Sequence, residues 1–299
     1  MHARAIEYFT GLQDRICAGL AAADGAATFR EDAWTRPGGG GGRSRVATDG
    51  AVIEKGGVNF SEVFGTFSPE FAKQMPGDGT AFTAAGVSLV IHPRSPLIPT
   101  VHANFRYLTH GSKAWFGGGA DLTPYYPFRD DVVHFHRTWK RVCDAHPAAA
   151  DYARMKRDCD DYFFLKHRNE PRGVGGIFFD HTDATEDVFA FVRAAGDAFL
   201  DAYLPIVERR KGLAYTPEER FFQEYRRGRY VEFNLVYDRG TVFGLKTDGR
   251  TESILMSLPP VVRYVYDYRP EPGSREAELT EYWLKPRDWC GEDHQTERG

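Results

Sequence analysis

Two apolar runs separated by three prolines, all within residues 86–108, constrain the fold more than any other part of the chain. The first run, residues 87–91, contains Val, Leu and Ile with a single Ser, and the second, residues 100–108, alternates polar residues with apolar or small ones. Proline lacks a backbone N–H donor and fixes φ, so the prolines between the runs interrupt a strand. We therefore predict two β-strands joined by a loop.

Alternation along these strands gathers polar side chains on one face. Successive side chains of a strand point to opposite sides, which places His102, Asn104 and Arg106 together and puts Ser88 on the same side of the first strand as His92. Such a face is costly to bury unless a ligand or a hydrogen-bond network satisfies it. We expect it to form the floor of a site for an anionic ligand, and a solvated sheet face is the alternative.

The order of the remaining segments predicts an α+β fold. Helical spacing of apolar residues is concentrated in the middle of the chain, and strand-like segments precede and follow it. The regular alternation of strands and helices that is typical of a parallel sheet is missing, so we expect an antiparallel sheet covered by helices. No linker divides the 299 residues, and we predict a single domain over residues 1–299.

Further elements are expected in the last quarter of the chain. A helix capped by Thr216 and Glu219, with Pro217 at its first position, is predicted to end at Gly228. Alternating apolar residues then predict strands at residues 230–237 and 241–246, with Asp238 in the turn between them, and a later strand around residues 264–268. Residues 274–284 are expected to form a C-terminal helix.

Four histidines are candidates for a shared metal site. His92 and His102 belong to the two strands described above, and apolar spacing puts His136 and His167 on the inward faces of two helices, expected at residues 130–146 and 151–168. Imidazole is the commonest transition-metal ligand. The spacing is not that of a compact metal motif, so a hydrogen-bond network is the alternative to a metal site.

Composition argues against several other functions. The net charge of −4 disfavours nucleic-acid binding, which usually requires a basic excess. The four cysteines lack zinc-type spacing and are expected to be free thiols. No apolar run approaches the ~20 residues of a membrane span, and the N-terminus has no signal-peptide pattern. We therefore expect a cytoplasmic protein.

Longer motifs carry a specific resemblance, because they extend over nearly the whole chain in a fixed order. They include GVSLVIHPRSPLIPTVHANFR, WFGGGADLTPYY, DDYFFLKHRNE, GVGGIFFD and YRRGRYVEFNLVYDRGTVFGLKTDGRTESILMSLPP. These segments closely resemble the family of oxygen-dependent coproporphyrinogen III oxidases. The resemblance implies a large, rather flat antiparallel sheet with helices on both faces, in a homodimer that associates through the region between Tyr230 and Val265.

The resemblance also implies a reaction. Proteins of this family convert two propionate side chains of coproporphyrinogen III to vinyl groups by oxidative decarboxylation, and protoporphyrinogen IX is formed on the way to haem. O2 is the co-substrate that accepts the electrons. A divalent metal cation is implied as a further cofactor, whereas the sequence contains no flavin or nicotinamide fingerprint.

Roles for individual residues follow from the matching motifs. His102 is implied as a proton donor, and Asp121 and Asp238 as carboxylates that face the pyrrole nitrogens; without the resemblance, both aspartates would be interpreted as turn residues. The implied metal ligands are His92, His102, His136 and His167. The implied substrate contacts are Ser88, Asn104, Phe105, Arg106, Asp248, Gly249 and Arg250.

Two positions depart from the family's usual pattern, since Val101 and Phe105 stand where relatives often carry Ser and Val or Tyr. A side-chain contact at Phe105 would change the shape of the site, whereas a backbone contact would not. Two other functions also fit the residues: a non-haem metal oxygenase that uses the four histidines, and a non-catalytic tetrapyrrole-binding protein. Dependence of turnover on Fe(II) would identify the first, and binding without release of CO2 would identify the second.

Overall fold

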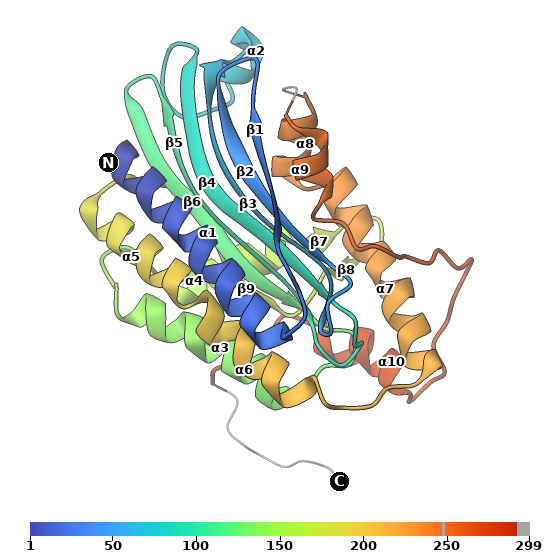
Figure 1. Ribbon diagram of the computed structural model, residues 1–299. Helices are drawn as coiled ribbons and strands as arrows, with labels where there is room; N and C mark the ends of the chain where they lie inside the picture. Colours follow the sequence, from blue (N-terminus) through green and yellow to red (C-terminus); the bar gives the residue numbers. More distant parts are fainter. Residues whose placement is uncertain (247–248, 292–299) are drawn as a thin grey trace.

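The computed structural model describes residues 1–246 and 249–291, and a seven-stranded antiparallel sheet lies at its centre (Figure 1). Strands β1 to β6 pair in chain order, and β9 joins the sheet beside β6. The strands are β1 (Arg30–Thr35), β2 (Gly40–Thr48), β3 (Ile53–Thr66), β4 (Ala81–Pro93), β5 (Thr100–His110), β6 (Lys113–Thr123) and β9 (Gly175–Asp183).

Strands β4 and β5 contain the two runs that flank the proline loop. Side chains along β5 alternate between buried and partly exposed positions, as expected when one sheet face packs against a core. Across the pair, Val90 lies opposite His102 and Ser88 lies opposite Asn104. The prediction of two neighbouring strands joined by a proline-rich loop is therefore confirmed.

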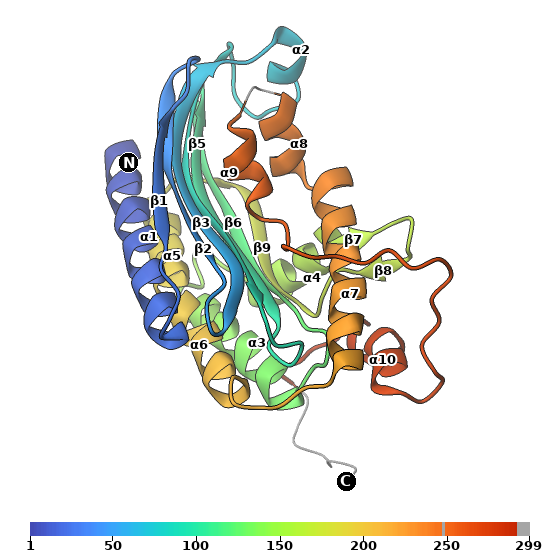
Figure 2. The same ribbon diagram turned by 45° about the vertical axis from the view of Figure 1, so that its right-hand side comes forward.

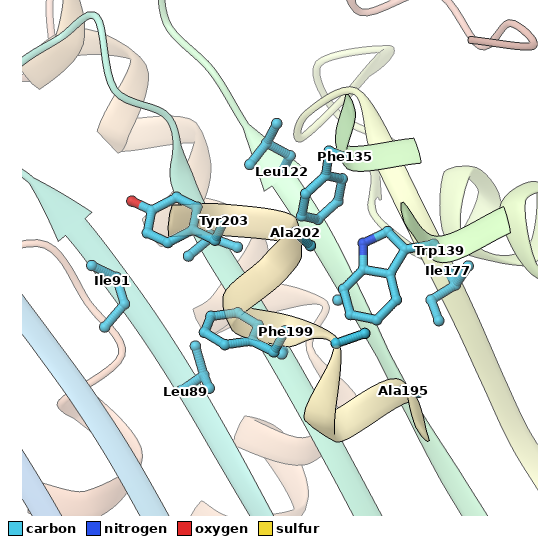
Figure 3. Packing of buried hydrophobic residues seen from close by; sticks show 14 of the residues in the cluster. Leu89, Ile91, Leu122, Phe135, Trp139, Ile177, Ala195, Phe199, Ala202 and Tyr203 are labelled. Atoms are coloured by element: carbon cyan, nitrogen blue, oxygen red, sulfur yellow. The ribbon is translucent and has the colours of Figure 1, made fainter. Parts of the chain in front are cut away.

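One face of the sheet packs against the hydrophobic core (Figure 3). Helices α1 (His2–Asp24), α3 (Arg129–Asp144), α5 (Glu186–Asp197) and α6 (Phe199–Arg210) cover this face (Figures 1 and 2). Sheet residues such as Leu89 and Ile177 share one cluster with helix residues such as Trp139 and Phe199, and all four side chains are at most 1% exposed. Complete burial of such a side chain contributes about 1.5–3 kcal/mol, so apolar packing on this face holds the sheet in place.

The opposite face of the sheet is covered by helices from later in the chain (Figure 2). They are α7 (Pro217–Val236), α8 (Arg239–Lys246) and α9 (Thr251–Leu255), while α4 (Tyr152–Tyr162) packs beside β9. Helices therefore lie on both faces of an antiparallel sheet, and the predicted α+β fold class is confirmed.

Short elements complete the fold. They are α2 (Pro69–Ala72), the separate strand pair β7 (Phe164–Leu165) and β8 (Glu170–Pro171), α10 (Arg275–Glu278) and a π-helical turn η1 (Leu279–Trp283). The last two occupy the position of the predicted C-terminal helix. Among the described residues, no helix is both long enough and apolar enough to cross a membrane.

Helix α7 corrects the prediction for residues 217–237. Its capping box, formed by Thr216 and Glu219, and its proline at the first turn were predicted, but the helix continues past Gly228 to Val236. The apparent strand alternation of residues 230–237 does not correspond to burial, because Phe233 is buried whereas Leu235 is 44% exposed. Contacts from buried side chains at helical spacing outweigh the local β preference.

Three further predictions are wrong for related reasons. Residues 241–246 belong to helix α8 and not to a strand, and residues 264–268 have no regular structure. Helix α4 ends at Tyr162, so residues 163–168 are not helical and His167 is exposed rather than inward-facing. Each of these segments is short and depends on long-range contacts that a local pattern does not contain.

Candidate active site

The sheet face below α7 to α9 is polar because cross-strand register aligns small polar side chains from neighbouring strands. Residues directly opposite each other in paired strands lie on the same face. One such row crosses six strands and consists of Asp32, Ser44, Asn59, Ser88, Asn104 and Gly119. Ser88 and Asn104, predicted as substrate contacts, are therefore cross-strand neighbours on this polar row.

Rows on either side of this polar row contain the charged groups. On one side, His102 lies opposite Asp121; on the other, Arg106 lies opposite Gly117. A larger residue in place of Gly117 would crowd these charged groups, because its Cβ atom would lie 2.6 Å from Asp180 Oδ1 and 3.0 Å from Arg106 Nε. The predicted gathering of His102, Asn104 and Arg106 on one face is confirmed, and glycine leaves room for the arginine.

His102 is oriented by Asp121. The His102 Nδ1–H donates to Asp121 Oδ1 at 2.8 Å, and the His102 side chain is 20% exposed whereas that of Asp121 is 1% exposed. Among the described residues, Nε2 of His102 has no hydrogen-bond partner. This arrangement fixes the tautomer of the imidazole and leaves its second nitrogen available for a ligand. Asp121, which the sequence alone would assign to a turn, is in fact a buried residue of strand β6.

Arg172 is the residue that allows a buried carboxylate at position 121. Its NH2 group donates to both oxygens of Asp121 at 2.9 Å each, and its NH1 group donates to Asn234 Oδ1 at 2.8 Å. The guanidinium carbon lies 4.1 to 4.8 Å from the ring centroids of Phe163, Tyr230 and Phe233. Aromatic faces attract a cation, so the three rings partly replace the water that this arginine loses.

The electrostatic balance keeps Asp121 ionised. Burial opposes the charged form, but the positive charge of Arg172 and the hydrogen bond from His102 outweigh it, and the pKa of Asp121 is lowered. Burial also opposes the charge of Arg172, whereas Asp121 raises the pKa of Arg172. Asp121 is therefore a charged residue that holds His102, with both oxygens already committed to Arg172.

Arg106 forms the second charged group of the site. Its NH2 group contacts Asp180 Oδ2 at 2.8 Å, its NH1 group donates to Asn104 Oδ1 at 3.0 Å, and its side chain is 31% exposed. Burial opposes ionisation of Asp180, but Arg106 dominates and lowers the pKa of Asp180. Arg239, 60% exposed, approaches the same carboxylate at 3.7 Å. Two cations thus meet at this point of the face.

Asp238 lies between two helices and not at the tip of a hairpin. Its Oδ2 accepts a hydrogen bond from the backbone N–H of Thr241 at 2.7 Å, and its Oδ1 accepts one from the Tyr162 hydroxyl at 2.9 Å. The first bond is that of an N-cap, which satisfies a free N–H group in the first turn of α8. Burial, followed by the charge of Asp238, raises the pKa of Tyr162 to about 12, so this hydroxyl remains a donor at neutral pH.

The four candidate metal ligands do not converge. No three His, Cys, Asp or Glu side chains within the described part of the chain are placed to hold a metal ion. His167 is exposed and hydrogen-bonds to Tyr237 and Glu232 at 2.9 and 2.6 Å. His102 is committed to Asp121 through Nδ1. Within the described part of a single chain the four histidines therefore do not come together, and their role as metal ligands stays a prediction.

His92 and His136 show why, because each uses both ring nitrogens inside the protein. His92 Nε2–H donates to the Ser257 carbonyl at 2.8 Å and Nδ1 lies 3.3 Å from Thr100 Oγ1. His136 Nε2–H donates to the Val174 carbonyl at 3.1 Å, and Nδ1 accepts from the Tyr152 hydroxyl at 2.8 Å. Both ring nitrogens of each histidine already have partners in the protein, so these residues fit the hydrogen-bond alternative.

The four remaining predicted contacts are Phe105, Arg250, Gly249 and Asp248, and each has a different outcome. The Phe105 side chain is 0% exposed in the core layer, so it cannot touch a ligand on the polar face, and a contact at this position is limited to backbone. Arg250 pairs with Asp32 at the edge strand β1. The Gly249 N–H donates to the Gly244 carbonyl at 2.8 Å. Asp248 lies outside the described residues.

Arg172, Asp180 and Asn234 were missed from the sequence. Arg172 follows Pro171 and precedes the glycine-rich start of β9, and Asp180 occupies a partly buried position in the same strand. The only local signal for Arg172 and Asp180 is a charge in or just before a strand that is otherwise apolar and glycine-rich. Asn234 had been assigned to a strand, so its contact with Arg172 required knowledge of helix α7.

A comparison with known families agrees with these motifs. The family model described as coproporphyrinogen III oxidase matches residues 4–289 of the chain. The match includes every residue of the sheet and all of the candidate site residues.

Proposed function

Because the chain belongs to the coproporphyrinogen III oxidase family, we propose that it decarboxylates two propionates of coproporphyrinogen III to vinyl groups, with O2 as electron acceptor and protoporphyrinogen IX as product. The family itself supports a role in coproporphyrinogen oxidation during tetrapyrrole synthesis. The observation that carries the finer proposal is the His102–Asp121–Arg172 array beside Asn104 and Arg106 on one sheet face.

Binding of the substrate is proposed to use the small side chains of this face. A macrocycle needs a surface without bulky projections, and the rows between His102 and Arg106 supply Ser, Asn and Gly across several strands. A substrate propionate would pair with the guanidinium of Arg106, since arginine binds carboxylates through two parallel hydrogen bonds. Arg239 lies close enough to the same point to assist.

Proton supply is the role proposed for His102. Each decarboxylation removes CO2, one β-hydrogen as a proton, and two electrons from a propionate. O2 accepts the two electrons and two protons and becomes H2O2. One of these protons comes from the β-hydrogen, so one further proton is consumed per vinyl group. An imidazole with Nδ1–H held by a carboxylate carries and releases a proton at Nε2. His102 has that arrangement, and its partial exposure allows the ring to be reprotonated.

The two carboxylates are proposed to act differently. Asp121 has both oxygens occupied by Arg172, so it orients His102 and does not accept a proton from the substrate. Asp238, with one oxygen bonded to Tyr162 and one to a backbone N–H, is proposed to stabilise positive charge on a pyrrole ring. Fixed dipoles and charges of this kind stabilise charge that develops in a transition state.

A homodimer is proposed on the basis of exposed apolar side chains. Contiguous exposed apolar surface commonly marks an interface. Six large apolar residues between positions 230 and 265 are 39% or more exposed: Leu235, Val236, Leu245, Val261, Tyr264 and Val265. Sedimentation of Val236→Glu should show a shift toward monomer, while Leu213→Glu, an exposed apolar position outside this segment, should sediment as the parent does.

Turnover under controlled oxygen tests the enzymatic proposal. The protein is incubated anaerobically with coproporphyrinogen III, air is then admitted, and the porphyrins are separated after oxidation. We expect the dicarboxylate product and CO2 only after air is admitted. Turnover without oxygen would refute the choice of acceptor. Binding without CO2 would indicate a tetrapyrrole carrier, and loss of turnover in chelator with recovery in Fe(II) would indicate a metal oxygenase.

A further inference from the structure

Arg250, a proposed substrate contact, is bound to a carboxylate of the same chain. Its NH2 group pairs with Asp32 Oδ2 on the edge strand β1. The Arg250 and Asp32 side chains are 34% and 41% exposed, so a solute can reach both. Arg250 Nε is buried and has no hydrogen-bond partner among the residues that the structure describes. The guanidinium therefore has donor capacity that Asp32 does not use.

Asp32 belongs to the same polar row as the predicted substrate contacts Ser88 and Asn104. Register places Asp32 opposite Ser44 at one end of that row, while Asn104 lies four strands away on β5. In its pair with Asp32, Arg250 is thus held over the edge of the polar sheet face, which is the proposed floor of the site. Arg106, the cation proposed to bind a propionate, lies on β5 near the other end of the floor.

Helix α9 has anchors that do not involve this ion pair. The hydroxyls of Ser253 and Ser44 are 2.6 Å apart, which fixes the helix to β2. Met256 packs on β3 at Gly57, where a Cβ atom would lie only 2.7 Å from the methionine sulfur. The Asp32–Arg250 pair is therefore not needed to hold α9 against the sheet, and an exposed ion pair contributes little to stability.

We propose that Asp32 is an internal competitor for the substrate: its carboxylate occupies Arg250 in the empty protein, and a substrate propionate displaces it. This inference rests on the proposed function, which makes the substrate a tetracarboxylate. A carboxylate on Arg250 is chemically equivalent to a propionate, so the exchange replaces one charge-assisted pair by another. The exchange leaves Asp32 without its cation, so the cost of separating Asp32 from Arg250 reduces the affinity for the ligand.

Equilibrium binding of coproporphyrin III, the oxidised and unreactive tetracarboxylate, tests this competition. The readout is the Kd of the full-length protein from porphyrin fluorescence. Asp32→Asn should lower the Kd about two- to fivefold, the range that exposed ion pairs supply. Glu31→Gln is the matched control, because it removes the same charge from the same strand on the opposite face, where Glu31 pairs with Arg45 at 2.8 Å. Its Kd should stay close to that of the parent.

A double-mutant cycle with Arg250→Gln identifies the mechanism. If Asp32 acts by occupying Arg250, the gain from Asp32→Asn disappears in the Arg250→Gln background. A gain that persists there would mean simple repulsion and would overturn the proposal. A higher Kd for Asp32→Asn would also overturn it, because Asp32 would then position Arg250 for the ligand. Absence of turnover in the parent protein would refute the proposed function separately, since the binding cycle does not depend on turnover.

Discussion

Replacement of Arg172 by Met should separate the stability of the buried charge pair from its role in turnover. Arg172 and Asp121 are 2% and 1% exposed, and one guanidinium nitrogen contacts both carboxylate oxygens at 2.9 Å. Removing one partner of such a pair leaves an uncompensated buried charge, which costs about 3–5 kcal/mol. Loss of the hydrogen bond to Asn234 and of the cation–ring contacts acts in the same direction.

The free energy of unfolding in urea measures this cost. We expect Arg172→Met to lose about 3–5 kcal/mol, and we expect the double variant Arg172→Met with Asp121→Asn to recover most of that loss, because neither partner then carries an uncompensated charge. Turnover should be low in Arg172→Met, because Asp121 loses the positive charge that keeps it ionised. It should also stay low in the double variant, since Asn at position 121 no longer holds the imidazolium form of His102 by its charge. The double variant should therefore unfold at nearly the parental free energy but should turn over poorly.

Arg168→Gln provides the control for a general effect of arginine loss. Arg168 pairs with Glu232 at 2.7 Å, but its side chain is 40% exposed, so its removal should cost no more than about 1 kcal/mol. A double variant as unstable as Arg172→Met alone would contradict the role of Arg172 in compensating the charge of Asp121. Turnover of Arg172→Met at the parental rate would contradict the role of this charge pair in turnover.

Three further outcomes follow from the same geometry. His102→Ala should reduce kcat by about a hundredfold through loss of the proton donor; near-native turnover of a folded variant would remove His102 from that role. Asp238→Asn should keep the hydrogen bond that caps α8 at Thr241, so the Tm should stay within a few degrees of the parent. We expect kcat to fall about tenfold, which corresponds to ~1.4 kcal/mol in the activation barrier. A parental kcat would mean that Asp238 serves only as a cap. Burial, followed by the charge of Lys156, lowers the pKa of His136 to about 3. The neutral His136 therefore contributes fully to stability above the unfolded-state pKa of about 6.5. Below that pH the contribution is lost at ~1.4 kcal/mol per pH unit, because the unfolded chain binds a proton that the folded protein does not. His136→Gln should therefore flatten the fall of the unfolding free energy between about pH 6.5 and 4.5, and an unchanged slope would show that His136 does not titrate in this way.

The histidines illustrate how tertiary contacts decide a role that residue type leaves open. Neutral imidazole is both a metal ligand and a hydrogen-bonding group. For His92, burial and the charge of Arg227 lower the pKa well below its usual value, so the ring is neutral, as a ligand must be. The Ser257 carbonyl and the Thr100 hydroxyl nevertheless occupy both nitrogens. Those partners come from distant parts of the chain and could not be inferred from spacing.

The sequence by itself determined the features that depend on near neighbours. The period of two along residues 100–108 placed His102, Asn104 and Arg106 on one face, and the prolines before them marked the loop between β4 and β5. The capping box and proline likewise fixed the start of α7. These signals are local because strand alternation, helix capping and the geometry of proline involve residues only a few positions apart.

Only the tertiary structure decided which side chains meet. Asp121 is a buried partner of His102 because Arg172, 51 positions later, neutralises it, and Phe105 is excluded from the site because α1, α3, α5 and α6 cover the face that it lies on. Residues 230–236 are helical because Phe233 and Asn234 are buried there. Burial free energy and charge compensation act between residues that are close in space, so a pattern of neighbours in the sequence does not contain them.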